Sequence, residues 1–480
     1  MRLSEIALAL ALAATAHAKV AAEWLQENHK AGDPPPTGEV DKHQTVVLSG
    51  TRDATDEGQP SSCPTIMIGT AVPDGDKDDG WKELPKVTGF DIARLVVDEE
   101  ANATLVGATA AVGSSATNDR GSDTWNNWDF GADMFLIGQP YFIENTKDLS
   151  NIKRAVITIA GARRNGWQYC NDMRNALVCA AGRDNVNADM DRVLIAAPQW
   201  LNEDDHSAGA VESNDVYFDN SSYQQGGAAL GPGDVRISSF EVLDKLVSSF
   251  WDKSVYPELE TVVIASHSLG AQMTQRYAML RPAQPEDANV SFGIMNPGSY
   301  AWPVSDRPEH DDDCEDTYND WPYGINDGQP DAFPEYVRDE VLANRSMIRE
   351  RYFSRNIFYG FGLDDHGDGD GHCEAQWQGD SHLERGQNFD KMLQDLSDGF
   401  PETQSVDYIP GVAHEDYKMF VSEPMQRKIF LFNTGNDTKD ANQARDSDDT
   451  QPSSDAPYQP IIPRFLLGSA LLSIIVGFYA

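Results

Sequence analysis

One short segment constrains the fold of this chain more than any other. Residues 261–265 are all apolar or β-branched, which is typical of a parallel strand covered on both faces, and the residues after Gly270 have the character of a helix that must end before Pro282. Ser268 therefore stands on a sharp turn between strand and helix, with its hydroxyl exposed beside the first N–H groups of the helix. The residues two positions either side of such a serine must be small. They are Ser266 and Gly270, and Ser266 departs from the usual pattern of glycine at both places.

A serine in this position is a candidate nucleophile, which needs an imidazole base and an acid that orients the imidazole. Where the serine stands on a strand-to-helix turn, the chain order is serine, acid, histidine. The acid is expected after the strand at 356–363, in the acidic, glycine-rich loop 364–371. We favour Asp365, at the point where strand gives way to loop, because Asp364 would point to the opposite side of the strand. Asp364 and Asp368 stay open as alternatives.

The same loop has a second interpretation as a calcium site, since oxygen ligands alternate there with glycines. The EF-hand template does not fit. Placing its glycine on Gly371 puts His366 at the first ligand position and Trp377 where the bidentate glutamate belongs. A calcium site of another geometry stays as the alternative, while the interpretation that we favour requires neither a metal ion nor a cofactor.

The base is expected on a loop that follows one more strand. Residues 405–409 form such a strand, Pro410 ends it, and His414 follows shortly before an amphipathic helix near 423–432. Two other histidines fit less well. His267 is expected to point away from the nucleophile across the turn, and His382 precedes the last strand. The sequence therefore predicts His414 as the base.

Catalysis at a carbonyl also requires N–H donors for the oxyanion. One is expected from Leu269, directly after the serine, and the second from the loop 161–167 that follows the strand at 155–160. Gly161 lets the backbone approach the substrate, so that the N–H of Ala162 or of Arg163 is the second donor. The arginines at 163 and 164 have two further interpretations: surface charge, or a site for an acidic group of the substrate.

These motifs together resemble the α/β-hydrolase superfamily, and within it secreted fungal-type serine hydrolases of undefined substrate. The resemblance implies a doubly wound, mostly parallel sheet and a triad of Ser268, Asp365 and His414; it implies no substrate. The matching segments cover roughly residues 152–432 and comprise 159–161 with Trp167 and Tyr169, 197–200, 238–244, the turn with 275–278, 296–300, 321–324, 365–373 with 378–379, and 411–414.

The two ends of the chain predict where the protein works. Residues 1–18 have the pattern of a signal peptide, and the apolar tail 464–480 follows a polar linker at 433–463. This arrangement favours a GPI-anchor signal, with Ser453 and Ser454 as attachment candidates, over a C-terminal membrane helix, for which the tail is short. We therefore expect a protein of the secretory pathway, extracellular or on the cell surface, and attached to the membrane at its C-terminus.

Between these ends, residues 19–150 read as an N-terminal extension with early strands near 65–69 and 94–97, and residues 151–432 as the core. A cap is expected at about 299–355. Its aromatic residues Trp302, Trp321 and Tyr323 either line a substrate pocket or form the core of the cap.

Secretion is consistent with two further sets of residues. Glycosylation sequons begin at Asn102, Asn220, Asn289, Asn344 and Asn436. The five cysteines predict the disulfides Cys170–Cys179 and Cys314–Cys373, with Cys63 left over.

Charge limits the partners. The chain has 37 basic and 77 acidic residues and a formal net charge of −40, so nucleic acids and anionic membrane surfaces are poor partners. The expected substrate is a carboxylic ester, either a small molecule or a polymer. The alternatives are an amide cleaved by the same triad, or a non-catalytic cell-surface protein with a hydrolase fold. The sequence predicts no oligomeric state.

Overall fold

The structure is a computed structural model, and it describes residues 46–48, 66–68, 73–87, 89–97, 137–183, 185–308, 314–325 and 330–431. The expected signal peptide, polar linker and apolar tail lie outside the described residues, as do Cys63, Asn102 and Asn436. Within the described ranges, no helix has the length and apolar character needed to cross a membrane.

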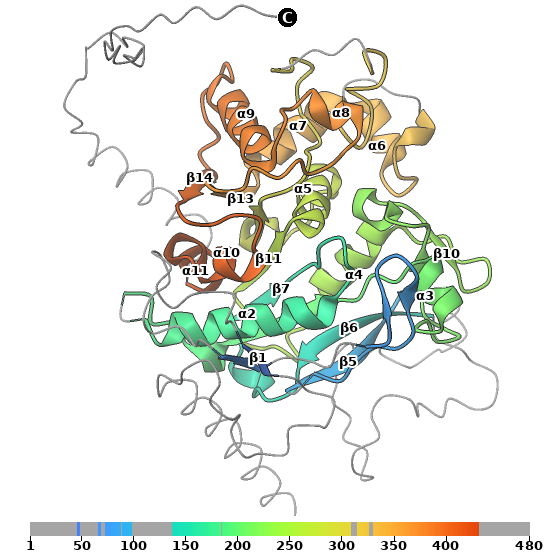
Figure 1. Cartoon of the computed structure of the whole chain (residues 1–480), viewed down its shortest axis with the longest axis vertical. Coiled ribbons are helices and arrows are strands. Elements are labelled where there is room, and N and C mark those ends of the chain that lie inside the picture. The colour runs from blue at the N-terminus through green and yellow to red at the C-terminus, as the bar shows by residue number, and fades with distance from the viewer. Residues whose placement is uncertain are drawn as a thin grey trace, which may run out of the picture.

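An eight-stranded sheet forms the centre of the molecule (Figure 1). The strands lie in the order β14, β13, β12, β11, β7, β8, β6, β5, and β6 alone runs antiparallel to both of its neighbours. The predicted class, a doubly wound and mostly parallel sheet, is therefore confirmed. The bounds of the strands are Phe90–Val96 (β5), Gly138–Glu144 (β6), Arg154–Ile157 (β7), Val193–Pro198 (β8), Thr261–His267 (β11), Val290–Met295 (β12), Asn356–Gly362 (β13) and Gln404–Ile409 (β14).

Short strands pair outside this sheet. The strand expected near 94–97 belongs to β5 of the main sheet, whereas the strand expected near 65–69 is β2, which pairs only with β1. The three small pairs are β1 with β2 (Val46–Leu48, Ile66–Ile68), β3 with β4 (Gly75–Asp76, Gly80–Trp81) and β9 with β10 (Tyr217–Phe218, Ala229–Gly231).

Helices cover both faces of the sheet. On one face α2 (Gly166–Ala181) packs against α10 (Asp416–Val421) and α11 (Glu423–Phe430). On the other lie α4 (Ser239–Phe250), α5 (Leu269–Leu280), α7 (Arg345–Ser354) and α9 (His382–Gln394). The connections contain α3 (Glu203–Ala208), α6 (Arg338–Ala343), α8 (Cys373–Gln376) and five 3-10 turns: η1 (Leu149–Asn151), η2 (Met190–Arg192), η3 (Ser222–Gln225), η4 (Asp287–Asn289) and η5 (Pro330–Ala332).

The central strands are buried on both faces because each contributes to two cores. Ile157 and Ile264 point into the core beneath α4 and α5, while Val156 and Val263 point into the core beneath α2. Successive side chains of a strand alternate between faces, so a strand covered on both sides must be apolar throughout. This explains the uninterrupted apolar run that precedes Ser268.

The expected cap lies between β12 and β13, and its aromatic side chains belong to the packed interior. Trp302 and Trp321 are buried in the core on the α5 side, and the ring of Trp321 packs edge-on against Phe240 of α4. The hydroxyl of Tyr323 donates a hydrogen bond to the carboxylate of Asp370. The second interpretation of these aromatics, as core residues, is therefore the better description.

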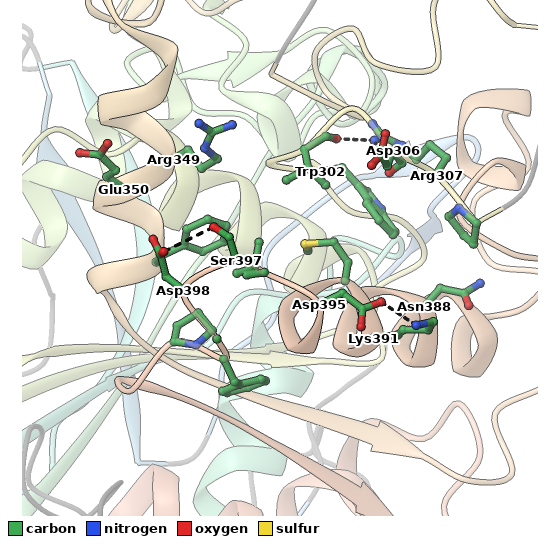
Figure 2. Close-up of a pocket in the computed structure, with 18 of the residues that line it drawn as sticks. Trp302, Asp306, Arg307, Arg349, Glu350, Asn388, Lys391, Asp395, Ser397 and Asp398 are labelled. Atoms are coloured by element: carbon green, nitrogen blue, oxygen red, sulfur yellow. Dashed lines mark hydrogen bonds and ion pairs between the residues drawn. The ribbon is translucent and has the colours of Figure 1, made fainter.

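Trp302 also borders a cavity of about 840 Å³, shown in Figure 2, whose wall includes Phe353 and Phe400. These two residues precede β13 and β14, so the cavity lies near the amino ends of the strands. The carboxyl ends, where Ser268 stands, are at the opposite edge.

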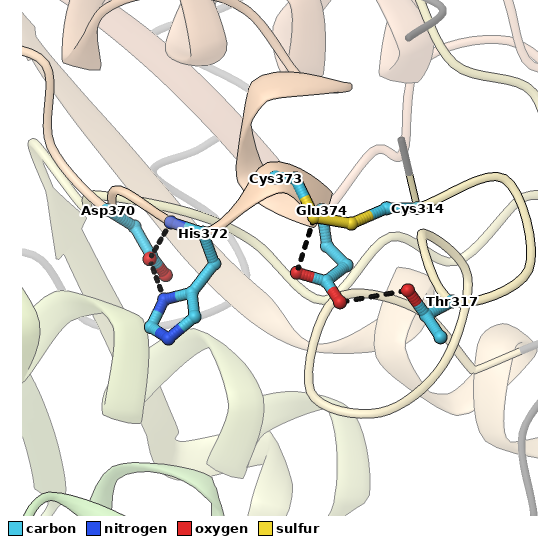
Figure 3. The surroundings of a disulfide bond; sticks show 6 residues. All are labelled: Cys314, Thr317, Asp370, His372, Cys373 and Glu374. Carbon is cyan, nitrogen blue, oxygen red and sulfur yellow. Dashed lines mark hydrogen bonds and ion pairs between the residues drawn. A yellow bond between two sulfur atoms is a disulfide. The ribbon is translucent and has the colours of Figure 1, made fainter. Parts of the chain in front are cut away.

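The structure contains the expected disulfide between Cys314 and Cys373, with Cα atoms 6.1 Å apart (Figure 3). The predicted pair Cys170–Cys179 is wrong: Cys170 is a buried free thiol, and Cys179 is bonded in another disulfide. Both residues lie on α2, nine positions apart, which separates them by about 13.5 Å along the helix axis. A disulfide requires Cα atoms within about 7 Å, so the helix itself prevents this pairing.

Candidate active site

Ser268 occupies a strained turn between β11 and α5. Its φ of 62° and ψ of −131° are unusual for a residue with a side chain, and such strain costs on the order of 1–3 kcal/mol. Gly270 closes the turn against the end of β7, where a Cβ at position 270 would lie 2.1 Å from the carbonyl oxygen of Ile159. The small residue expected after the serine is thus required by a backbone contact.

Ser266, the departure from the usual pattern, has a structural explanation. Its side chain is buried, and its Oγ accepts a hydrogen bond of 3.1 Å from the backbone N–H of Ile159. The Oγ1 of Thr274 lies 2.9 Å from Ser266 Oγ and 2.9 Å from the carbonyl oxygen of Gly270. A hydroxyl has one proton, so Thr274 donates to Gly270 while Ser266 donates to Thr274. The hydroxyl at 266 therefore ties the loop after β7 to the helix that carries the nucleophile.

The structure brings Ser268, His414 and Asp365 together at the carboxyl ends of three strands. His414 Nε2 lies 2.8 Å from Ser268 Oγ, and His414 Nδ1 lies 2.7 Å from Asp365 Oδ2. The side chain of Asp365 is 1% exposed and that of His414 is 34% exposed. A hydroxyl, an imidazole and a carboxylate in such a hydrogen-bonded chain can act as nucleophile, base and acid in acyl transfer.

Asp365 is held as a carboxylate. Burial acts to raise its pKa, but hydrogen bonds from His382 and His414 and the charges of these rings act more strongly in the other direction, so the pKa of Asp365 lies well below its usual range. Asp364 and Asp368 are exposed to solvent. Of the aspartates considered from the sequence, Asp365 alone contacts His414.

Two further histidines surround the ring of His414, and neither role was predicted. The ring of His382 stacks on that of His414 with centroids 4.0 Å apart, and its Nδ1 lies 3.2 Å from Asp365 Oδ1 and 2.9 Å from the carbonyl oxygen of Gly367. The ring of His267, expected to point away from the nucleophile, packs at 4.5 Å on His414. Burial, with a smaller contribution from His414, lowers the pKa of His267 well below its usual range. His414 therefore lies between two imidazoles.

Asn296, at the end of β12, holds the acid and base loops together. Its side chain is 1% exposed; Oδ1 accepts from the N–H of Gly362 at 2.8 Å, and Nδ2 donates to the carbonyl oxygen of Ala413 at 3.2 Å. Gly362 precedes the acid and Ala413 precedes the base. One buried amide thus fixes both loops, and its positive φ of 44° is one that asparagine tolerates.

The donors expected for the oxyanion stand beside Ser268. The N–H of Leu269, like the first N–H groups of every α-helix, has no acceptor within the helix. Gly161 faces the serine, since a Cβ at this glycine would lie 3.4 Å from Ser268 Cβ. Ala162 and Arg163 follow it on an exposed turn closed by a hydrogen bond from Arg164 N to Gly161 O.

The two arginines of this turn differ. Arg164 makes a buried, two-pronged salt bridge to Asp205, so its charge is internal. The backbone oxygen of Arg163 accepts from the indole N–H of Trp81, and its side chain is exposed. Only Arg163 is free to meet a substrate.

The described residues contain one group beside the nucleophile with the donor types and spacing of a metal site: ligand atoms of Asp365, His382 and His414 lie within 4.8 Å of one another. A metal ion there would compete for the histidine nitrogens that face Asp365. The loop aspartates considered as calcium ligands do not converge; Asp370 instead accepts hydrogen bonds from Ser299 and Tyr323.

The eight strands, with the second antiparallel and the serine turn after the fifth, followed by acid and histidine after later strands, define the α/β-hydrolase fold. No model of a known protein family and no curated protein sequence matches this chain.

Solved structures match it with low similarity. A poly(3-hydroxybutyrate) depolymerase from Bordetella parapertussis is 18% identical over 64% of this chain and 88% of its own, with a TM-score of 0.40. Poly(aspartic acid) hydrolase-1 from Sphingomonas sp. KT-1 is 18% identical over 61% and 93%, also with a TM-score of 0.40. An S-formylglutathione hydrolase from Agrobacterium tumefaciens is 12% identical over 62% and 90%, with a TM-score of 0.34. At these values the fold assignment rests on the strand order and not on the likeness.

Proposed function

We propose that the protein hydrolyses a carboxylic ester through an acyl-enzyme intermediate. Ser268 Oγ adds to the ester carbonyl carbon as its proton passes to His414 Nε2, and the carbonyl electron pair moves onto oxygen. The oxyanion collapses, the bond to the alcohol breaks, and His414 returns the proton to the leaving alcohol. Water then repeats the addition with His414 as base, which releases the acid and restores the Ser268 hydroxyl.

The observation that carries this proposal is the hydrogen-bonded chain from Ser268 through His414 to Asp365. Asp365 orients the imidazole through Nδ1 and stabilises the imidazolium that forms. Its lowered pKa keeps it ionised through the pH range in which the imidazole works. The exposed edge of His414 faces the serine and not the acid, so proton transfer occurs on the side open to substrate.

A fluorophosphonate probe tests the nucleophile. Ser268→Ala is expected to abolish both ester hydrolysis and probe labelling while secretion stays intact, because the substitution removes only the hydroxyl. Undiminished labelling of this variant would exclude the proposed nucleophile. Esters and amides of the same acyl groups, assayed in parallel, separate ester hydrolysis from the amidase alternative.

The choice of base is tested by comparing two histidines. His414→Ala is expected to lower kcat by about 10³-fold or more on the precedent of catalytic triads. His382→Ala keeps the contact between Ser268 and His414 and is expected to cost less. The reverse order would assign the base to His382.

The choice of acid is tested in the same way. Asp365→Asn is expected to keep the fold and lose most activity, because an amide cannot stabilise the imidazolium. The exposed Asp364→Asn is the matched control and should cost little. If Asp365 is the acid, EDTA should leave the activity unchanged. A graded loss of activity across variants of Asp364, Asp368 and Asp370 that calcium restores would favour the metal interpretation instead.

We also propose that the protein is secreted, glycosylated and attached to the cell surface by a lipid. The sequons at Asn220, Asn289 and Asn344 begin at exposed residues, as glycosylation requires. A phosphatidylinositol-specific phospholipase is expected to release the mature protein from cells. Release by detergent alone would indicate a membrane helix instead.

A further inference from the structure

A buried tyrosine hydroxyl shares the face of Gly161 with the nucleophile. Tyr169, in the first turns of α2, is 4% exposed, and its ring packs edge-on against Phe420 of α10. A Cβ at Gly161 would lie 2.7 Å from the Tyr169 hydroxyl oxygen and 3.4 Å from Ser268 Cβ. Any side chain at Gly161 would therefore stand between the tyrosine and the serine.

The hydroxyl is available as a donor. Its oxygen receives a hydrogen bond from the backbone of Gly161, and across the described ranges no acceptor takes its proton. Burial, supported by the charges of Asp416 and Asp172, raises the pKa of Tyr169 well above its usual value. The phenol is accordingly protonated at every pH at which an ester hydrolase of this kind would act, and its proton is free for a ligand.

We propose that the Tyr169 hydroxyl is a catalytic side-chain donor to the oxyanion, acting opposite the N–H of Leu269. The inference rests on the proposed ester hydrolysis at Ser268. As Ser268 Oγ adds to the carbonyl carbon, the carbonyl oxygen gains the electron pair and turns toward the bare face of Gly161. There Tyr169 donates a hydrogen bond to this oxygen. When the oxyanion collapses, the electron pair returns to re-form the carbonyl bond.

This assignment explains two features that backbone donors leave unexplained. A glycine is needed at position 161 although its φ is not in the left-handed region, because a side chain would fill the space between hydroxyl and serine. The tyrosine side chain is only 4% exposed, yet its hydroxyl proton has no acceptor among the described residues, so a ligand at Ser268 can take it. A charge-assisted O–H···O⁻ bond is roughly twice as strong as a neutral one, so its benefit falls on the transition state.

The test is Tyr169→Phe, which removes one oxygen atom. Loss of one oxyanion donor lowers kcat by about 10²–10³-fold, with KM nearly unchanged because the ground-state carbonyl does not carry the charge. Tyr256→Phe is the matched control. Tyr256 is also buried but precedes β11 and therefore lies at the opposite edge of the sheet. It should leave kcat within about twofold, as expected of a residue remote from the reaction.

A merely structural role is distinguished by an inhibitor that imitates the tetrahedral adduct. An arylboronic acid forms a tetrahedral adduct when the Ser268 hydroxyl adds to its boron. Its affinity for the Tyr169→Phe variant is expected to fall by about the same factor as kcat/KM. Thermal unfolding of Tyr169→Phe should show only the fall in stability that the loss of the hydrogen bond from Gly161 causes. Gly161→Ala, which displaces the hydroxyl without removing it, should reproduce the loss in kcat.

The outcomes separate this inference from the function on which it rests. Unchanged kcat and boronate affinity in Tyr169→Phe overturn the role of Tyr169 while Ser268→Ala remains inactive. A fall in kcat that is accompanied by an equal rise in KM and by a matching fall in thermal stability also overturns the role of Tyr169, since these changes together indicate damage to packing. Activity that survives Ser268→Ala overturns the proposed function itself.

Discussion

Ser266 offers a direct test of how the structure replaces the usual glycine before the nucleophile. In Ser266→Ala the backbone N–H of Ile159 loses its acceptor but stays buried, which costs about 1–3 kcal/mol of the free energy of unfolding. Thr274 keeps its bond to the Gly270 carbonyl, so the loss is confined to one donor. We expect a destabilisation near 2 kcal/mol, measured by denaturant unfolding.

Two matched variants sharpen this prediction. Thr274→Val leaves the bond between Ile159 and Ser266 intact but removes the acceptor of the buried Ser266 hydroxyl, so it should also cost about 1–3 kcal/mol. Ser266→Gly restores the common pattern and should still destabilise at least as much as Ser266→Ala. Both variants at 266 loosen the loop after β7, so kcat should also fall. A Ser266→Gly protein as stable and active as the parent would refute the proposed structural role of this hydroxyl.

Three further substitutions follow from the site. Asn296→Ala should lower kcat by about 10²-fold with little change in KM, because the acid and base loops lose their shared partner; circular dichroism checks that the fold persists. Gly270→Ala should cost at least about 3 kcal/mol of the free energy of unfolding, because its Cβ would meet the carbonyl oxygen of Ile159. A variant as stable as the parent would contradict this contact. For Asp365→Asn, the pKa of the carboxyl is depressed in the folded state, so its stabilisation is present above the unfolded pKa of about 3.9 and is lost as the pH falls below it. The difference in unfolding free energy between parent and variant should thus shrink as the pH falls below about 4.

The features predictable from the sequence are those set by local chemistry. The apolar run before Ser268 and its small neighbours are local patterns that indicate a strand-to-helix turn, whereas the order of acid and histidine was supplied by the chain order of α/β-hydrolases. The contacts of His382 and Asn296 were not predictable, because they join segments that are distant in sequence and their residue types have many other uses. Of the two predicted disulfides, Cys314–Cys373 is confirmed, whereas Cys170–Cys179 failed because a continuous helix holds these two residues apart.

The disulfide between Cys314 and Cys373 closes a covalent ring of chain that contains α6, α7, β13 and Asp365, while Ser268 and His414 lie outside it. A protease that cuts once within this ring leaves both fragments joined. Such a nicked enzyme would migrate as one species on a non-reducing gel and as two on a reducing gel. The acid would stay tethered to both of its partners until the disulfide was reduced. Resistance of activity to nicking, and its loss on later reduction, would therefore report on this ring and not on the integrity of the peptide chain.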